Sequence, residues 1–291
     1  MRALAALACA ATLVAAPAAA HEGQAHGAAL PWTFDPWIIV PLAISACVYA
    51  LGAGHLAERT DLRRRGWEHA CYLLGWLALA AALVSPLHWL GEHLFSFHMI
   101  EHEIVMAVAA PLLVLARPLG PLLWAFPKPA RVALAGLAQG NFWRAGWSAL
   151  TRPFTATMLH GVAIWGWHVP AWFDAAVESD ALHRLQHLSF LVTGLLFWWA
   201  LVRRATPGVA VGHLFVTMLH TGVLGALMAL APRVLYTVRT QYAADWGLTP
   251  LEDQQLAGLI MWVPAGTIYA GAALAFAARW IRRSRADWRT A

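Results

Sequence analysis

The chain contains little charge and little cysteine. Only 12% of its 291 residues are charged, whereas 60% are hydrophobic and the mean hydropathy is +0.57. This composition lies outside the range of ordinary water-soluble domains. The net charge of +5 does not indicate nucleic-acid binding, because the basic residues follow the pattern of membrane orientation described below. The sequence therefore predicts an integral membrane protein.

Cysteine occurs three times in the whole chain. Cys9 lies in the N-terminal apolar stretch, and Cys47 and Cys71 fall in separate hydrophobic segments without a C-x-x-C spacing. This pattern suggests neither a disulfide framework nor a thiolate metal site. The sequence also lacks the period-2 alternation of a membrane barrel and any internal repeat, so we expect a single helical domain.

The first 20 residues have the layout of a secretory signal peptide. Arg2 precedes an apolar stretch that ends in three consecutive alanines at positions 18–20. We expect cleavage there, with His21 as the new N-terminus. Residues 21–36 would then form a periplasmic segment, in which HEGQAH at 21–26 is a candidate first acceptor for a metal ion.

Seven apolar runs are long enough to cross a bilayer, which takes about 20 residues each. Because lipid offers no partner to an unpaired backbone group, these runs are predicted to be helices. They lie at residues 37–57, 67–86, 98–116, 154–172, 184–202, 209–231 and 255–279. The predicted fold is an all-α bundle of seven transmembrane helices over residues 37–279, followed by a basic tail at 280–291.

Lysine and arginine are concentrated in alternate connections between these runs. Most of the 20 basic residues lie in 58–66, 117–153, 203–208 and the tail. By the positive-inside rule, the N-terminus is periplasmic and the C-terminus cytoplasmic. Before the last run, Thr249, Pro250 and Glu252 form the pattern of a capped helix start, with Pro at the first helical position and Glu three residues after the cap.

Fourteen histidines are many for this length, and they include two pairs at helical spacing. His98 and His102 are four residues apart in the third run, and His183 and His187 repeat this spacing in the fifth. The spacing puts both imidazoles of a pair on one helix face, as metal sites on helices require. Ionisable residues inside spans usually face an interior or a pathway. We therefore expect the two pairs to form a metal site.

Further side chains extend this candidate site. Thioether beside imidazole suits Cu(I), so methionines next to the first pair are candidate ligands, although methionine is usually core filler. These methionines are Met99 and Met106. His168, at the outer end of the fourth run, is another candidate ligand, and His160 and His220, near mid-membrane, are secondary candidates.

The pattern leaves other interpretations open. Histidines at the membrane interface can lie among lipid headgroups, and the nearby Glu92, Glu101 and Glu103 are then solvated. HMIEH at 98–102 also matches the H-x-x-E-H motif of inverted zinc peptidases, with Glu101 as general base. A seven-helix zinc hydrolase acting on lipid is related to this alternative. Facing histidines can also hold a b-type haem, and a metal-free scaffold is a further alternative.

Four segments resemble the seven-span CtaG-type cytochrome c oxidase assembly factors. They are HMIEHEIVMAVAAPLLVLARP, WGWHVPAWFDAA with HRLQHLSFLVTGLLFWWAL, and LYTVRTQYAADWGLTPLEDQQLAGLIMWVPAG. The likeness covers nearly all of the chain after residue 35, and the run from Asp253 to Trp262 is its most distinctive piece. The chain departs from the family motif at Glu101, where glutamine is frequent, and this departure adds a negative charge beside the imidazoles.

The resemblance implies a bacterial inner-membrane assembly factor rather than an enzyme. It implies copper as the bound metal, with zinc as the alternative, and delivery from the periplasmic side to the catalytic subunit of a cytochrome c oxidase. The implied partners are this subunit, a periplasmic copper donor and membrane lipid, without nucleic acid. The recurrent histidines of the family match His98, His102, His168, His183 and His187, and Asp253, a secondary metal candidate, opens the last helix together with Gln254.

Overall fold

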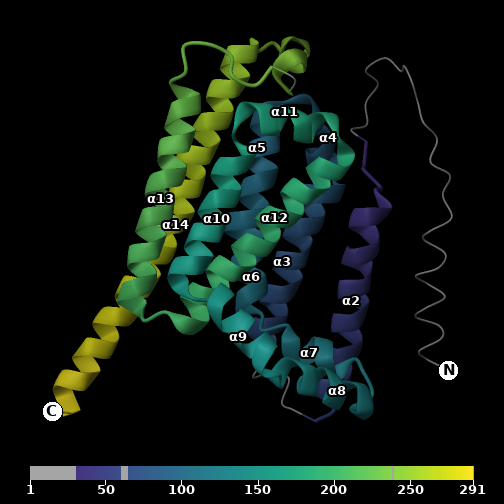
Figure 1. Cartoon of the computed structure of the whole chain (residues 1–291), viewed down its shortest axis with the longest axis vertical. Coiled ribbons are helices and arrows are strands. Elements are labelled where there is room, and N and C mark those ends of the chain that lie inside the picture. Colours follow the sequence, from purple (N-terminus) through teal and green to yellow (C-terminus); the bar gives the residue numbers. More distant parts are fainter. Residues whose placement is uncertain (1–30, 60–64, 238, 291) are drawn as a thin grey trace.

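The computed structural model describes residues 31–59, 65–237 and 239–290 (Figure 1). Within these ranges the chain is helical and contains no strand, which confirms the predicted all-α class. The predicted signal peptide and the HEGQAH segment lie outside the described residues.

In the described part of the chain, six helical stretches are long and apolar enough to cross a bilayer. Their length and composition make this chain a membrane protein. They are α2 (Pro36–Ala57), α3 (Gly66–Val84), the stretch Phe95–Leu115, the stretch Asp180–Arg204, α13 (Pro207–Ala229), and the part Pro250–Ser284 of α14 (Pro250–Thr290).

Two of these stretches contain a π-helical turn. The first consists of α5 (Phe95–Glu103), the π-helix η2 (Ile104–Ala109) and α6 (Ala110–Leu115). The second consists of α12 (Asp180–Trp199) and the π-helix η3 (Ala200–Arg204). Such turns are frequent at functional sites, and η2 directly follows the HMIEHE segment.

The fourth predicted span is divided into α10 (Pro153–Trp167) and α11 (Pro170–Glu178). The residue before Pro170 adopts an extended conformation with ψ of 122°, as steric contact with a proline ring favours. The 15 residues of α10 span about 22 Å at 1.5 Å each, which is less than the hydrocarbon core of about 30 Å. The helix packs against α12 and α13 within the bundle. The seven-span count therefore stays a prediction.

The connections contain helices that the sequence reading treated as loops. They are α4 (Pro86–His93), α7 (Leu119–Trp124), α8 (Lys128–Gln139), α9 (Asn141–Leu150) and the 3-10 helix η4 (Arg239–Trp246). Figure 1 shows α4 and α11 at one end of the bundle and α7, α8 and α9 at the other. The basic connection 117–153 thus lies at the end opposite α4 and α11, and the assignment of that end to the cytoplasm stays a prediction.

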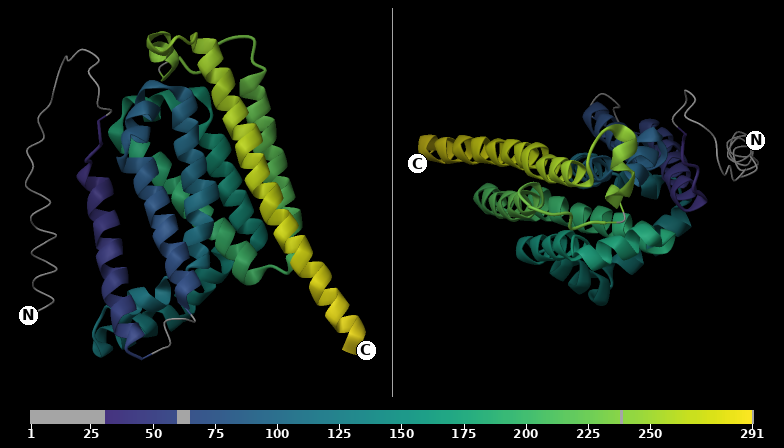
Figure 2. Two further views of the ribbon diagram at one scale, coloured as in Figure 1. Left: turned by 180° about the vertical axis from the view of Figure 1, so that it is seen from behind. Right: turned by 90° about the horizontal axis from the view of Figure 1, so that it is seen from above.

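The last two helices lie side by side as an antiparallel pair (Figure 2). Glycine permits their close approach, because a Cβ atom at Gly258 would lie 2.5 Å from the carbonyl oxygen of Gly225. The predicted capping box of α14 is confirmed. The backbone N–H of Thr249 donates to Glu252 at 2.7 Å, and that of Glu252 donates to the Thr249 hydroxyl at 3.2 Å.

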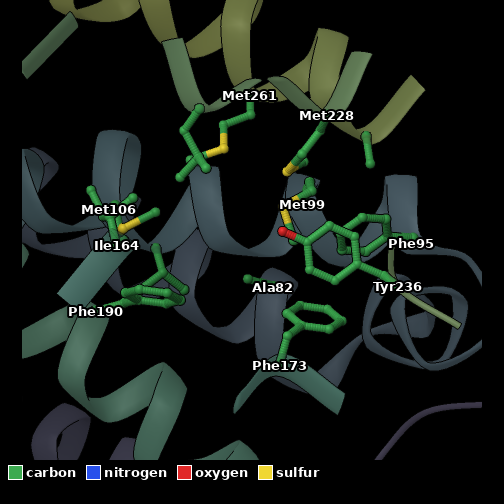
Figure 3. Close-up of a cluster of buried hydrophobic side chains, with 14 of the residues drawn as sticks. Ala82, Phe95, Met99, Met106, Ile164, Phe173, Phe190, Met228, Tyr236 and Met261 are labelled. Carbon is green, nitrogen blue, oxygen red and sulfur yellow. The ribbon is translucent and has the colours of Figure 1, made fainter. Parts of the chain in front are cut away.

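An apolar core fills the space between α3, α5, η2, α10, α11, α12, α13 and α14 (Figure 3). Aromatic and methionine side chains make up most of its volume, and they pack around the start of the Phe95–Leu115 stretch. The core includes Phe95, Phe173, Phe190, Tyr236, Met99, Met106, Met228 and Met261. Two of its side chains, Phe173 and Phe190, lie against the rings of His98 and His102 on α5.

Candidate metal centre

The helices α5 and α12 bring the two histidine pairs together near the end of the bundle where α4 lies (Figure 1). The ring centroids of His98 and His102 are 4.2 Å apart, and those of His102 and His187 are 5.0 Å apart. The ring of His183 stacks against that of His98 at 5.3 Å. Two segments that are distant in the sequence therefore form one cluster of imidazoles.

Within this cluster, four side chains offer ligand atoms that all lie within 4.8 Å of one another: His98, Glu101, His183 and His187. The Nε2 atoms of His183 and His187 are 2.9 Å apart. The Oε2 atom of Glu101 lies 3.5 Å from Nδ1 of His98 and 4.0 Å from Nε2 of His187. Metal bonds of about 2.0–2.1 Å put tetrahedral ligands about 3.3 Å apart. Small side-chain adjustments would therefore let this group hold a metal ion.

Glu101 is the member of this group that sequence reasoning did not place among the ligands. Its side chain is 0% exposed, so the expectation that it is solvated is wrong, and Glu103 is also buried. Glu101 lies three residues after His98, and this i, i+3 spacing was the signal that could have identified it. The carboxylate fits the centre because a buried charge needs paired or coordinating neighbours.

The helix α4 orients the carboxylate of Glu101. His88 on this helix donates from Nδ1 to Oε1 of Glu101 at 2.9 Å. A Cβ atom at Gly91 would lie 2.8 Å from Oε2, so any larger residue would have to displace the carboxylate. Residues that hydrogen-bond to a metal ligand in this way fix the orientation of the ligand in proteins.

The other predicted ligands lie around this group. His102 is outside the four-residue group. Its ring lies between that group and His168, whose ring centroid is 6.2 Å away. His168 follows the end of α10, and its Nε2 lies 3.5 Å from the sulfur of Met99. Figure 3 shows Met106 beside Ile164 in the apolar core. A ligand role for these residues stays a prediction.

The two mid-membrane histidines lie between other helices. His160 on α10 donates from Nδ1 to the Thr193 hydroxyl at 3.1 Å. His220 on α13 accepts a hydrogen bond from the indole of Trp165 at 3.3 Å. Neither belongs to the four-residue group, so the structure does not bring them to the centre.

Asp253, a secondary metal candidate, lies outside the four-residue group and makes structural contacts with the backbone of α5. Its two carboxylate oxygens accept from the backbone N–H groups of Phe95 at 2.7 Å and Ser96 at 3.0 Å. It therefore caps the N-terminus of α5 from a different helix, α14. This contact places the first turn of α5, which carries His98 and Met99.

The next residue, Gln254, holds the connection before α14. Its Oε1 accepts from the backbone N–H groups of Leu235 and Tyr236, and its amide donates to the carbonyl of Arg233 at 3.3 Å. Tyr236 in turn donates from its hydroxyl to the carbonyl of His168 at 2.7 Å. Burial raises the pKa of Tyr236, so this hydroxyl stays protonated and continues to donate.

Three imidazoles and one carboxylate make a donor set that suits copper or zinc. His98, Glu101 and His187 are buried, whereas His183 is partly exposed toward the end of the bundle. His183 is therefore the most accessible member of the group.

Comparisons with known proteins link this arrangement to a family. The chain is 29% identical over 271 residues to uncharacterized proteins of Mycobacterium bovis and Mycobacterium tuberculosis, and 26% identical over 268 residues to one of Mycobacterium leprae. Each alignment covers 87% of this chain and 40% of the relative, so the chain spans well under half of their length. No solved structure matches the chain.

A family model described as cytochrome c oxidase caa3 assembly factor (Caa3_CtaG) matches residues 47–283. The match includes α5, α12 and the start of α14, which together carry the imidazole cluster and the cap of α5. The chain therefore belongs to the family of cytochrome c oxidase caa3 assembly factors.

Proposed function

We propose that the chain binds copper at the centre formed by His98, Glu101, His183 and His187 and delivers it to the catalytic subunit of a cytochrome c oxidase. The ion enters from a donor on the periplasmic side of the bacterial inner membrane, and the chain acts as a carrier rather than an enzyme. Membership of an oxidase assembly family supports the choice of partner.

One observation carries this proposal: four side chains from two helices, all of types that bind metal ions, gather in a bundle whose helices are apolar enough to span a membrane. His98 and Glu101 are each 0% exposed. Ionisable groups inside membrane proteins are costly and usually mark a functional site. Imidazole and carboxylate ligands also exchange an ion more readily than a closed set of thiolates, as delivery requires.

The position of Glu101 favours binding over hydrolysis. In the zinc peptidase alternative, its carboxylate must be available to take a proton from a metal-bound water. Here Oε1 accepts a hydrogen bond from His88, and Oε2 faces His98 and His187. This arrangement is typical of a carboxylate that binds a metal ion through one oxygen while a second residue, here His88, holds the other oxygen by a hydrogen bond.

The test compares two histidines at the same end of the bundle. His183→Asn removes a ligand whose ring is only half-buried, so the fold is expected to survive the change. His93→Asn is the matched control, because His93 is also half-buried and its Nδ1 contacts only the carbonyl of Trp89 among the described hydrogen bonds. Metal content is measured on the full chain in detergent after loading with Cu(I), Cu(II) or Zn(II). Oxidase activity is measured in host cells that carry each variant.

The wild type and His93→Asn are expected to retain copper and to support oxidase activity. The His183→Asn variant should insert normally but bind copper about 100-fold more weakly or worse. Loss of a residue that only hydrogen-bonds to a metal ligand already lowers metal affinity by about 10–100-fold. Host cells with this variant should lack active oxidase. Full oxidase activity with His183→Asn would refute the proposal, and retention of zinc in preference to copper would favour the hydrolase.

A further inference from the structure

Met99 and His168 meet on a different side of α5 from the metal centre. Met99 follows His98 directly, and successive residues of an α-helix point about 100° apart. The sulfur of Met99 lies 3.5 Å from Nε2 of His168, and these residues are 1% and 4% exposed. The contact is therefore buried and separate from the group around Glu101.

The hydrogen bond at the other ring nitrogen determines which atom of His168 carries the proton. Nδ1 lies 2.6 Å from the carbonyl oxygen of Ile164, and a carbonyl can only accept, so Nδ1 donates. In the neutral ring, Nε2 then has a lone pair and no hydrogen. A thioether sulfur is also an acceptor. Two electron-pair donors thus face each other with no hydrogen atom between them.

A second proton on His168 would not fit this environment. It would create a buried cation, which needs a paired charge. In the part of the chain that the structure describes, no ion pair includes His168. The rings of Phe173 and Phe190 lie 6.5 and 6.3 Å from the imidazole. A metal cation that bonds to both Nε2 and the sulfur would satisfy the two lone pairs.

The separation of the two atoms fits such a bridge. With metal bonds of about 2.0 Å to nitrogen and about 2.3 Å to sulfur, the observed 3.5 Å corresponds to an angle of about 110° at the ion. This is close to the tetrahedral angle. A thioether and an imidazole form a softer donor set than one with a carboxylate, and they favour Cu(I) over divalent ions.

We propose that Met99 and His168 form a second copper site, which is selective for monovalent Cu(I). The inference rests on the proposed function, in which copper is the transported ion. His102 supplies a further imidazole between the two sites, since its ring lies 4.2 Å from His98 and 6.2 Å from His168. The same residue can therefore act as a ligand of either site while an ion passes between them.

The surroundings hold this second site in place. Tyr236 donates to the carbonyl of His168 at 2.7 Å, and Gln254 holds the backbone of Tyr236. Figure 3 shows Met99 among Met228, Phe95 and Tyr236 in the apolar core. A low-charge ion suits this lining better than a divalent ion, because burial of charge costs less for the smaller charge.

The test uses two buried methionines of the apolar core. Met99→Leu removes the sulfur and nearly conserves the volume of the side chain. Met261→Leu is the matched control, because Met261 is also 1% exposed and belongs to the same core but is not a candidate ligand. The full chain is loaded with Cu(I) in detergent under anaerobic reducing conditions. Elemental analysis gives the copper content per chain, and X-ray absorption at the copper edge identifies the ligand atoms.

The wild type and Met261→Leu are expected to bind one ion at each site and to show sulfur at about 2.3 Å from copper. Met99→Leu should lose one ion together with the sulfur signal and keep the other. Copper bound by nitrogen and oxygen alone, with no change in Met99→Leu, would overturn the second site and leave the proposed function standing. Loss of both ions in Met99→Leu would overturn the separation of the sites. A wild type that binds no copper would overturn the proposed function itself.

Discussion

Replacement of Asp253 by alanine should destabilise the protein far more than replacement of its neighbour Glu252. Asp253 accepts from the N–H groups of Phe95 and Ser96, which are 0% and 1% exposed, so water cannot replace the lost oxygens. Hydrogen bonds to charged groups contribute about 1.5–3 kcal/mol each. The loss of two such bonds should lower the free energy of unfolding by about 3–6 kcal/mol.

Thermal unfolding of the full chain in detergent measures this effect. For chains of 150–250 residues, 1 kcal/mol shifts Tm by about 2–4 °C, so Asp253→Ala should lower Tm by at least about 6 °C. Glu252→Ala removes only the solvent-exposed capping contact with the backbone N–H of Thr249, which water can then bind. This control should therefore lower Tm much less than Asp253→Ala does.

The same change should weaken metal binding, because the capped turn of α5 carries His98. The backbone N–H of His98 donates to the carbonyl of Leu94 within this first turn. Asp253→Ala should therefore lower copper affinity, whereas Glu252→Ala should leave it unchanged. If Asp253→Ala lowers Tm no more than Glu252→Ala does, the cap across the two helices does not stabilise the protein and the reasoning fails.

Two glycines allow further tests. Gly91→Ala should displace the carboxylate of Glu101 and lower copper affinity by about 10–100-fold in a competition titration. Gly54→Ala, whose Cβ meets no described atom within 4 Å, should leave the affinity unchanged. Gly258→Ala should force α13 and α14 apart and lower the free energy of unfolding by about 1–3 kcal/mol. Gly271→Ala, in an open part of α14 among the described residues, is its control, and equal Tm values for these two variants would contradict the close packing.

Local chemistry was sufficient to predict the helical class, most of the spans and the capping box at Thr249. Apolar runs of about 20 residues leave a backbone in lipid no alternative to helix. A capping box depends on residues three apart, so it can be read directly from the sequence. The spacing of His98 and His102, and of His183 and His187, likewise fixes which face of each helix carries imidazoles.

Tertiary structure alone decided which donors meet. Periodicity defines the faces of each helix, but the rotation and depth at which two helices pack depend on contacts with the whole bundle. The cap from Asp253 to α5 joins residues 157 and 158 positions apart, and no local pattern signals such a contact. In the same way, the contact of His88 on α4 with Glu101 made a residue that was expected to be solvated a candidate ligand. The tertiary structure also brought His168, at the end of α10, to Met99 on α5. The sequence determined that metal-binding groups are present, and the packing of the helices determined how they are grouped.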